Sequence, residues 1–386
     1  MVDRLPMTPP DIPGLNYLSP LGRGGFADVF LYSQSVPNRR VAVKIFLKKF
    51  DSKSPSAISF IAEANNLGNL GGHANIVNIF EANISRDGNP YISMEYCPTS
   101  LGKDWRTNPL GLERVLDIGV QIACALETVH KSNLIHRDIK PSNILINSFN
   151  VPVLSDFGIA GEINVADTSD QIAMSLPWSA PEVVALQTLG SVHSDVFSLG
   201  ATLYSLLAGR TPFESDDAKQ NENEKLKSRI IKATYTPIPK GGIPKIVESV
   251  LSKAMQREPI HRFASMQEFA MALNDVQMAM QFQVTRLTFP TAASQASAEI
   301  IEKYPCGHPK VDTSGLREGV YVETGSTRRS KQEVKLDPDQ CPICATTETF
   351  KPAKKKFKLG LLFWVLTGTA VFGFVATYVF LSISGV

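Results

Sequence analysis

One ten-residue segment in the middle of the chain combines residues that suit phosphoryl transfer. This segment is HRDIKPSNIL, residues 136–145. Phosphoryl transfer depends on positioning and charge neutralisation more than on covalent chemistry. Asp138 can accept the proton of an attacking hydroxyl, and Lys140 can neutralise the transferred group. Asn143 offers a neutral oxygen ligand to a magnesium ion.

A second segment supplies the charged ligand that such a metal needs. SDFG follows at residues 155–158, and its Asp156 is an acidic oxygen donor for the same ion. With Asn143, it predicts a site for Mg²⁺, with Mn²⁺ as an alternative. We expect His136 to be a packing and hydrogen-bonding residue rather than an acid or base.

A glycine-rich turn near the N-terminus predicts a cradle for the phosphates of ATP. The turn lies within LGRGGFADVF, residues 21–30. Gly22 and Gly24 lack a side chain, so the backbone can approach phosphate oxygens closely. Leu21 and Val29 would cover the nucleotide base. Taken alone, this pattern also fits an ordinary hairpin turn.

A lysine and a carboxylate complete the predicted nucleotide site. In VAVK (41–44), alternation along a strand puts Ala42 and Lys44 on the same face, where Lys44 can reach the phosphates. A half-buried lysine requires a carboxylate partner. Glu63 lies on the inward face of a helix predicted over 55–70, so we expect it to pair with Lys44.

The elements that position these residues divide into two lobes. Residues 17–96 read mainly as strands, apart from the helix at 55–70, which Ser54 would cap. From about residue 112 an apolar stripe at helical spacing predicts a long helix, and residues 196–208 are apolar enough for a buried one. The predicted class is therefore α+β, with a strand-rich N-lobe and a helical C-lobe.

In this order the motifs resemble those of the eukaryotic protein kinase family, particularly its bacterial serine/threonine branch. The set also includes APE at residues 180–182. The resemblance covers residues 14–283 and implies a bilobal kinase fold, with an N-lobe over about 14–96 and a C-lobe over about 97–283. It further implies an ATP-dependent phosphotransferase acting on protein serine and threonine hydroxyls.

The resemblance also assigns residues outside the central motifs. Met94 would be the gatekeeper, and the backbones of Glu95 and Cys97 would bind adenine. Two further assignments are structural: Asp195 would brace the catalytic loop, and Arg262 would pair with Glu182.

The type of hydroxyl acceptor follows from the same resemblance. Lys140, two residues after Asp138, and Ser175 match the serine/threonine pattern. Thr168, Ser169 and Ser175 are hydroxyl groups that phosphorylation could modify, and the sequence leaves open whether activity requires it.

The tail predicts a small metal site. Residues 284–300 are small and polar and suit a linker, and residues 301–350 hold a Cys/His set. Two pairs of ligands suit structural Zn²⁺ in a reducing compartment; the alternative is free thiols and a surface histidine. The predicted ligands are Cys306, His308, Cys341 and Cys344.

The end of the chain predicts a membrane anchor. Residues 359–381 contain no charge and would form a helix of about 34 Å, which is long enough to cross a bilayer. The basic cluster at 351–358 precedes them and would keep the kinase domain cytosolic and contact anionic lipids.

The prediction is thus a membrane-tethered, single-pass serine/threonine kinase whose partners are protein substrates and the lipid bilayer. The net charge of +2 argues against nucleic acid as a partner, and dimerisation for autophosphorylation remains open. Two alternatives also remain. One is a catalytically weak, pseudokinase-like scaffold, and the other is a zinc-module membrane adaptor that the kinase domain regulates.

Overall fold

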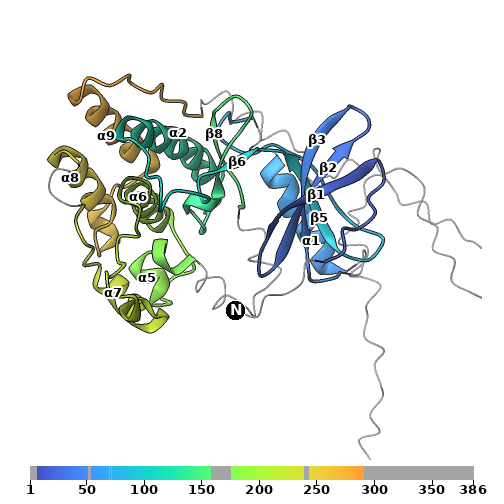
Figure 1. Ribbon diagram of the computed structural model, residues 1–386, viewed down its shortest axis with the longest axis horizontal. Helices are drawn as coiled ribbons and strands as arrows, with labels where there is room; N and C mark the ends of the chain where they lie inside the picture. Colours follow the sequence, from blue (N-terminus) through green and yellow to red (C-terminus); the bar gives the residue numbers. More distant parts are fainter. Residues whose placement is uncertain are drawn as a thin grey trace, which may run out of the picture. The chain divides into compact units, whose positions relative to one another are not determined.

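The structure, a computed structural model, describes residues 7–50, 54–68, 70, 72–157, 175–238 and 243–290, without several side chains of helix α1. The chain divides into two compact units, Met1–Gln295 and Ala296–Val386, and every described residue belongs to the first. That unit has a strand-rich lobe and a helical lobe (Figure 1), as the sequence predicted.

The strand-rich lobe is an antiparallel sheet in the order β1-β2-β3-β5-β4. Along β3, Val41, Val43 and Ile45 are completely buried on one face. Ala42 and Lys44 alternate with them and face the other side, which carries helix α1. The strands are β1 (Leu15–Arg23), β2 (Ala27–Gln34), β3 (Arg39–Phe46), β4 (Ile79–Ile84) and β5 (Pro90–Glu95).

Helix α1 (Pro55–Gly68) begins where its capping residues predict. The Ser54 hydroxyl accepts a hydrogen bond from the Ala57 N–H at 3.2 Å, and Pro55 occupies the first turn. Phe60 packs edge-on against Phe46 of β3, with ring centroids 5.4 Å apart. The helix is thereby held to the face of the sheet that carries Lys44.

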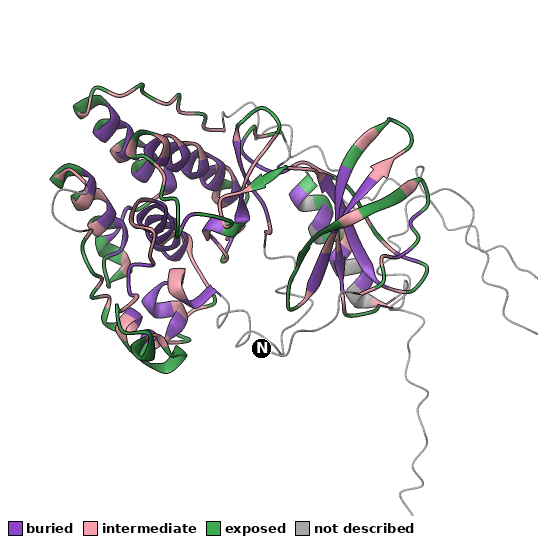
Figure 2. Cartoon of the chain, in the orientation of Figure 1, coloured by how far each residue is buried: buried purple, intermediate pink, exposed green. Residues whose placement is uncertain are grey.

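The helical lobe is built around α2 and α6, which Figure 2 shows buried along most of their length. The two helices pack closely because a Cβ on Gly119 of α2 would lie only 2.9 Å from Leu203 of α6. The strands and α-helices of the helical lobe are β6 (Thr99–Ser100), α2 (Leu112–Lys131), β7 (Ile144–Ile146), β8 (Pro152–Leu154), α5 (Pro181–Val184), α6 (Val192–Ala208), α7 (Asn223–Lys232), α8 (Lys245–Ala254) and α9 (Met266–Ala279).

A buried ion pair ties the APE motif to the segment before α9. The two terminal nitrogens of Arg262 donate to the two carboxylate oxygens of Glu182, both at 2.7 Å. The remaining Arg262 donors bond the carbonyls of His193, Gln256 and Arg257. This confirms the predicted pair, and its complete hydrogen bonding offsets the cost of burying two charges.

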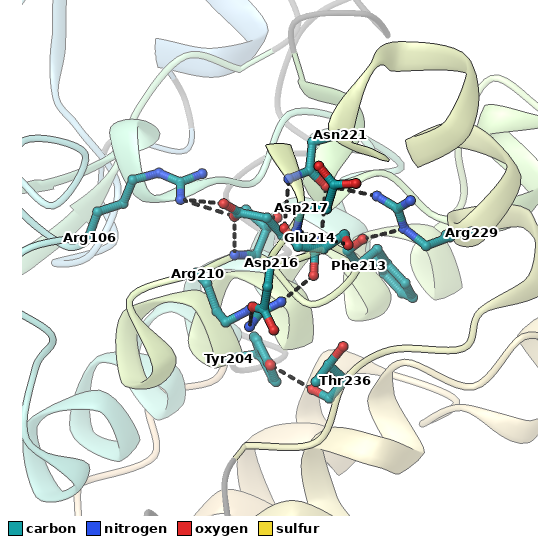
Figure 3. Close-up of polar contacts among 12 residues, drawn as sticks. Arg106, Tyr204, Arg210, Phe213, Glu214, Asp216, Asp217, Asn221, Arg229 and Thr236 are labelled. Atoms are coloured by element: carbon teal, nitrogen blue, oxygen red, sulfur yellow. Dashed lines mark hydrogen bonds and ion pairs between the residues drawn. The ribbon is translucent and has the colours of Figure 1, made fainter. Parts of the chain in front are cut away.

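Polar contacts hold the loop between α6 and α7 in shape (Figure 3). Arg106 donates to both oxygens of Glu214 at 3.0 Å, which connects the loop to the segment before α2. Arg229 of α7 donates to the Phe213 carbonyl and to Asn221. The loop is therefore anchored from both sides, and its apolar Phe213 stacks on Phe197 of α6.

The folded unit extends beyond the domain boundary predicted from composition. The small, polar composition of residues 284–300 predicts a linker, yet its described part, residues 284–290, forms an extended segment with partly buried Leu287 and Phe289. Thr285 is bonded to Asp117, which lies 168 positions away, and to Gln277 at the end of α9. Composition alone could not reveal these partners.

The remaining tail predictions fall outside the described residues. These are the zinc ligands, the basic cluster and the apolar run at 359–381. Within the described ranges, no helix is long and apolar enough to cross a membrane. No group of three or more His, Cys, Asp or Glu residues there could hold a metal ion.

Candidate active site

One buried carboxylate holds the backbone of the catalytic loop, the segment that begins at His136 and carries Asp138. Asp195 of α6 is fully buried and accepts hydrogen bonds from the backbone N–H groups of His136, at 2.9 Å, and Arg137, at 3.0 Å. His130 at the end of α2 lies 2.8 Å from the same carboxylate through its Nε2. Asp195 therefore braces the loop as predicted. Sequence reasoning missed His130, because a histidine at the end of an amphipathic helix carries no distinctive signal.

His136 is a structural residue in this loop. Its Nδ1 accepts from the Asp138 N–H at 3.3 Å, and its Nε2 lies 3.0 Å from the Ser155 carbonyl. A neutral ring with its proton on Nε2 satisfies both contacts. Burial lowers the pKa of His136 below its ordinary value, which favours that neutral form. The packing and hydrogen-bonding role expected for this residue is confirmed.

Three side chains converge on Asp138. Lys140 Nζ lies 2.9 Å from Asp138 Oδ1 and donates to Ser175 Oγ at 2.9 Å. Ser175 donates in turn to Asp138 Oδ1. Asn143 Nδ2 donates to Asp138 Oδ2 at 2.8 Å and to the Asp138 carbonyl at 2.7 Å. The arrangement orients one carboxylate beside one cation and one hydroxyl.

The donors expected for a metal lie on adjoining segments. Asn143 ends the short 3-10 helix η1 (Pro141–Asn143), and its carbonyl accepts from the Ser155 N–H at 2.9 Å. The Asn143 amide nitrogen is committed to Asp138, so the atom that would face a cation is the side-chain oxygen, which also accepts a hydrogen bond from Ser142 at 3.3 Å. Asp156 follows Ser155 directly. A carboxylate and an amide oxygen are the hard donors that Mg²⁺ prefers, so these residues fit the ion.

Lys44 connects the two lobes through Asp156. Its Nζ donates to Asp156 Oδ1 at 2.6 Å. Burial by itself would raise the pKa of Asp156, but the charge and hydrogen bond of Lys44 hold this pKa below its ordinary value. Asp156 therefore stays ionised at neutral pH, as a metal ligand must. The expected partner Glu63 lies on α1, but its side chain is outside the described set.

The glycine-rich turn lies between β1 and β2. Gly24 donates its N–H to the Ala27 carbonyl at 2.8 Å, and a Cβ on Gly24 would approach that oxygen to 3.1 Å. A Cβ on Gly22 would meet nothing within 4 Å. Val29 of β2 pairs in register with Lys44 of β3, so the turn and the lysine belong to neighbouring strands.

The predicted adenine segment follows β5. Met94 is buried and pairs with Ala42, while Leu21 on β1 is exposed. The Glu95 N–H donates to the Asn78 carbonyl at 2.9 Å, so its own carbonyl is the group suited to an adenine amine. Burial, followed by the nearby Glu95 carboxylate, raises the pKa of the Cys97 thiol to about 12, so this thiol stays neutral.

The segment that joins the two halves of the site is only partly described. Residues 158–174, which include Thr168 and Ser169, are outside the described ranges. Ser175, the last of the three candidate hydroxyls, already bonds Asp138 and Lys140. Trp178 in the following turn donates its ring N–H to Ser205 at 3.0 Å. Within the described part of the chain, Ser175 is thus the candidate hydroxyl at the site.

Comparison with known proteins also indicates a protein kinase domain. The family model described as the protein kinase domain matches residues 15–273. The serine/threonine-protein kinase PknK of Mycobacterium tuberculosis is 33% identical over 296 residues, which are 75% of this chain and 26% of that protein. PrkC of Bacillus subtilis is 30% identical over 290 residues, covering 74% of this chain and 43% of the relative.

A third similar protein also aligns with most of this chain but with less than half of its own length. The serine/threonine-protein kinase Pkn1 of Myxococcus xanthus is 30% identical over 315 residues, which are 78% of this chain and 42% of that protein. The alignments with these three relatives span less than half of their length. The similarity therefore concerns the catalytic region.

Proposed function

The chain belongs to the protein kinase family, and from this premise we propose that it transfers the γ-phosphoryl group of ATP to serine and threonine hydroxyls of protein substrates. One observation carries the proposal: Lys140, Ser175 and Asn143 all bond Asp138, while Lys44 and Asp156 meet across the two lobes. The residues that we propose as base, phosphate-binding cation and metal-binding carboxylate thus belong to two clusters, which the backbone bond between Asn143 and Ser155 connects.

In the proposed reaction Asp138 accepts the proton of the substrate hydroxyl and orients its oxygen. Lys140 stabilises the negative charge of the transferred group, and its bond to Ser175 holds the ammonium beside Asp138. Lys44 binds the phosphates of ATP with help from Glu63. When bound, Mg²⁺ would supply positive charge that neutralises the phosphates, and Asn143 and Asp156 are the residues that would hold it.

The proposed serine/threonine specificity rests on the Lys140–Ser175 contact and on the similarity to proteins named serine/threonine-protein kinases. A pseudokinase-like scaffold is the alternative within the same fold. Two features favour catalysis over a scaffold. Asp156 is ionised, as a ligand of Mg²⁺ must be, and the Asp138 carboxylate is already oriented by its hydrogen bonds before substrate binds.

Lys44→Met and Asp156→Asn should each lower the phosphotransfer rate by about 100-fold to 1,000-fold, because the first removes the cation proposed to bind the ATP phosphates and the second removes the charged ligand proposed for Mg²⁺. The measurement is phosphate transfer to a protein acceptor with Mg²⁺ and ATP, alongside thermal unfolding. Lys253→Met is the matched control, since Lys253 is an exposed lysine of α8 paired with Glu268. Activity within a few-fold of wild type in either active-site variant would refute the assigned roles.

We further propose that residues 359–381 anchor the kinase to a membrane with its catalytic region in the cytosol. The full chain should remain in the membrane fraction after a carbonate wash. A chain ending at residue 350 should be soluble and should keep phosphotransfer activity, because residues 351–386 hold the proposed span and its lysines. The topology is wrong if the truncated chain stays in the membrane. It is equally wrong if protease added outside intact cells cleaves the kinase domain.

The third part of the proposal is one structural Zn²⁺ per chain, held by Cys306, His308, Cys341 and Cys344. Elemental analysis of the purified full chain should give one zinc, and Cys341→Ser should abolish it because a tetrahedral site needs its fourth ligand. Cys97→Ser is the control, since Cys97 lies in the kinase domain. A full chain without zinc, or one whose zinc survives Cys341→Ser, contradicts the assignment.

A further inference from the structure

The segment after α9 runs back over the helical lobe as an extended strap. We name residues 282–290 the C-terminal strap (Figure 1). Gln281 adopts a left-handed backbone (φ 57°), and the Phe282 N–H donates to the Gln277 carbonyl at 2.9 Å, so the chain reverses at the end of α9. Leu287 and Phe289 then pack against the core.

Thr285 is the first anchor of the strap. Gln277 of α9 is completely buried and bonds Thr285 with both amide atoms: Nε2 donates to Oγ1 at 2.8 Å, and Oε1 accepts from the Thr285 N–H at 2.9 Å. The Thr285 hydroxyl donates to Asp117 of α2 at 3.0 Å. Displacement of the strap would deprive the buried Gln277 amide of both these partners, so this contact stabilises the bound position of the strap.

His73 provides the second anchor, on the connection between α1 and β4. Its Nδ1 accepts from the Asn75 N–H at 3.1 Å, so in the neutral ring Nε2 carries the proton. Nε2 lies 3.3 Å from the Thr288 carbonyl of the strap. Burial lowers the pKa of His73 below its ordinary value, which favours this neutral form. The strap therefore joins the helical lobe to the connection that follows α1.

That connection pairs directly with the strand that leads to Asp156. The Leu154 N–H donates to the Asn75 carbonyl at 2.9 Å, and the Val77 N–H donates to the Leu154 carbonyl at 3.0 Å. The Asn75 side chain also donates to the Pro152 carbonyl at 2.8 Å. Leu154 ends β8, and Asp156 lies two residues further on.

A second route leads from the strap to the same place. The Asn75 amide donates to Gln121 at 2.8 Å, and Gln121 donates to Asp117 at 2.8 Å. Asp117 is the carboxylate that Thr285 bonds. The two routes meet at Asn75, so a hydrogen-bonded circuit runs from the strap to the backbone that carries Asp156.

We propose that the C-terminal strap positions the active site: through Thr285 and the His73–Thr288 contact it holds the connection after α1 against β8 and so places Asp156. The inference rests on the proposed phosphotransfer, because Asp156 is the proposed metal ligand. The strap is followed by the residues that we propose to carry the zinc and the membrane span, so it lies in the chain between them and the active site.

The test compares variants of the full chain by two measurements. Thr285→Val removes the hydroxyl at nearly constant shape, and His73→Phe removes the second anchor. Thr285→Ser keeps the hydroxyl and should therefore behave like the wild-type chain in both measurements. Thr107→Val is the matched control, because Thr107 is exposed and its hydroxyl donates to the nearby Asp104 carbonyl at 3.3 Å.

The first measurement is hydrogen exchange of the peptide covering residues 152–157, without nucleotide. The second is the Mg²⁺ concentration that gives half-maximal phosphotransfer at saturating ATP. For Thr285→Val and His73→Phe we expect faster exchange and a Mg²⁺ requirement raised about threefold to tenfold, the factor that corresponds to one hydrogen bond. Thr285→Ser and Thr107→Val should match wild type in both.

Unchanged exchange, or faster exchange with an unchanged Mg²⁺ requirement, would overturn the proposal, even if the melting temperature fell. A merely structural strap would lower stability without altering the metal requirement. Absence of phosphotransfer in the wild-type chain would instead refute the proposed function and this inference with it. The exchange and activity measurements therefore separate the two failures.

Discussion

The buried carboxylate of Asp195 determines the shape of the catalytic loop, because it accepts the N–H groups of both His136 and Arg137. Arg137 has a left-handed backbone (φ 69°), a conformation that costs a non-glycine residue about 1 to 3 kcal/mol. The two charge-assisted hydrogen bonds offset this strain. The Asp138 side chain is therefore held where its carboxylate contacts Lys140 and Asn143.

Asp156 repeats this pattern on the neighbouring segment. Its backbone is also left-handed (φ 61°), and its carboxylate is held by Lys44 from the other lobe. The Ser155 N–H bonds the Asn143 carbonyl, so the two proposed metal ligands share one backbone framework. The site thus depends on contacts that cross between segments far apart in sequence, and the strap adds contacts to α2, α9 and His73.

Strand and helix patterns were sufficient to predict the two lobes, and the motifs were sufficient to select the residues that lie around Asp138 and Asp156. Lys44, Asp138 and Asp156 carry chemistry that few other patterns require, so their types and order were informative. The strap was not predictable, because Thr285 looks like any polar linker residue and its partner Asp117 lies 168 positions away. His130 was missed for the same reason: its contact with Asp195 depends on how α2 packs on α6.

The proposed reaction transfers phosphate with Asp138 as the base. The most direct measurement is phosphate transfer from ATP to protein serine and threonine by the full chain, compared with Asp138→Asn, which keeps the size of the side chain and removes its charge. We expect phosphoserine or phosphothreonine with the wild-type chain and a loss of about 100-fold or more in the variant. Equal transfer by both chains, with both folded, would contradict it.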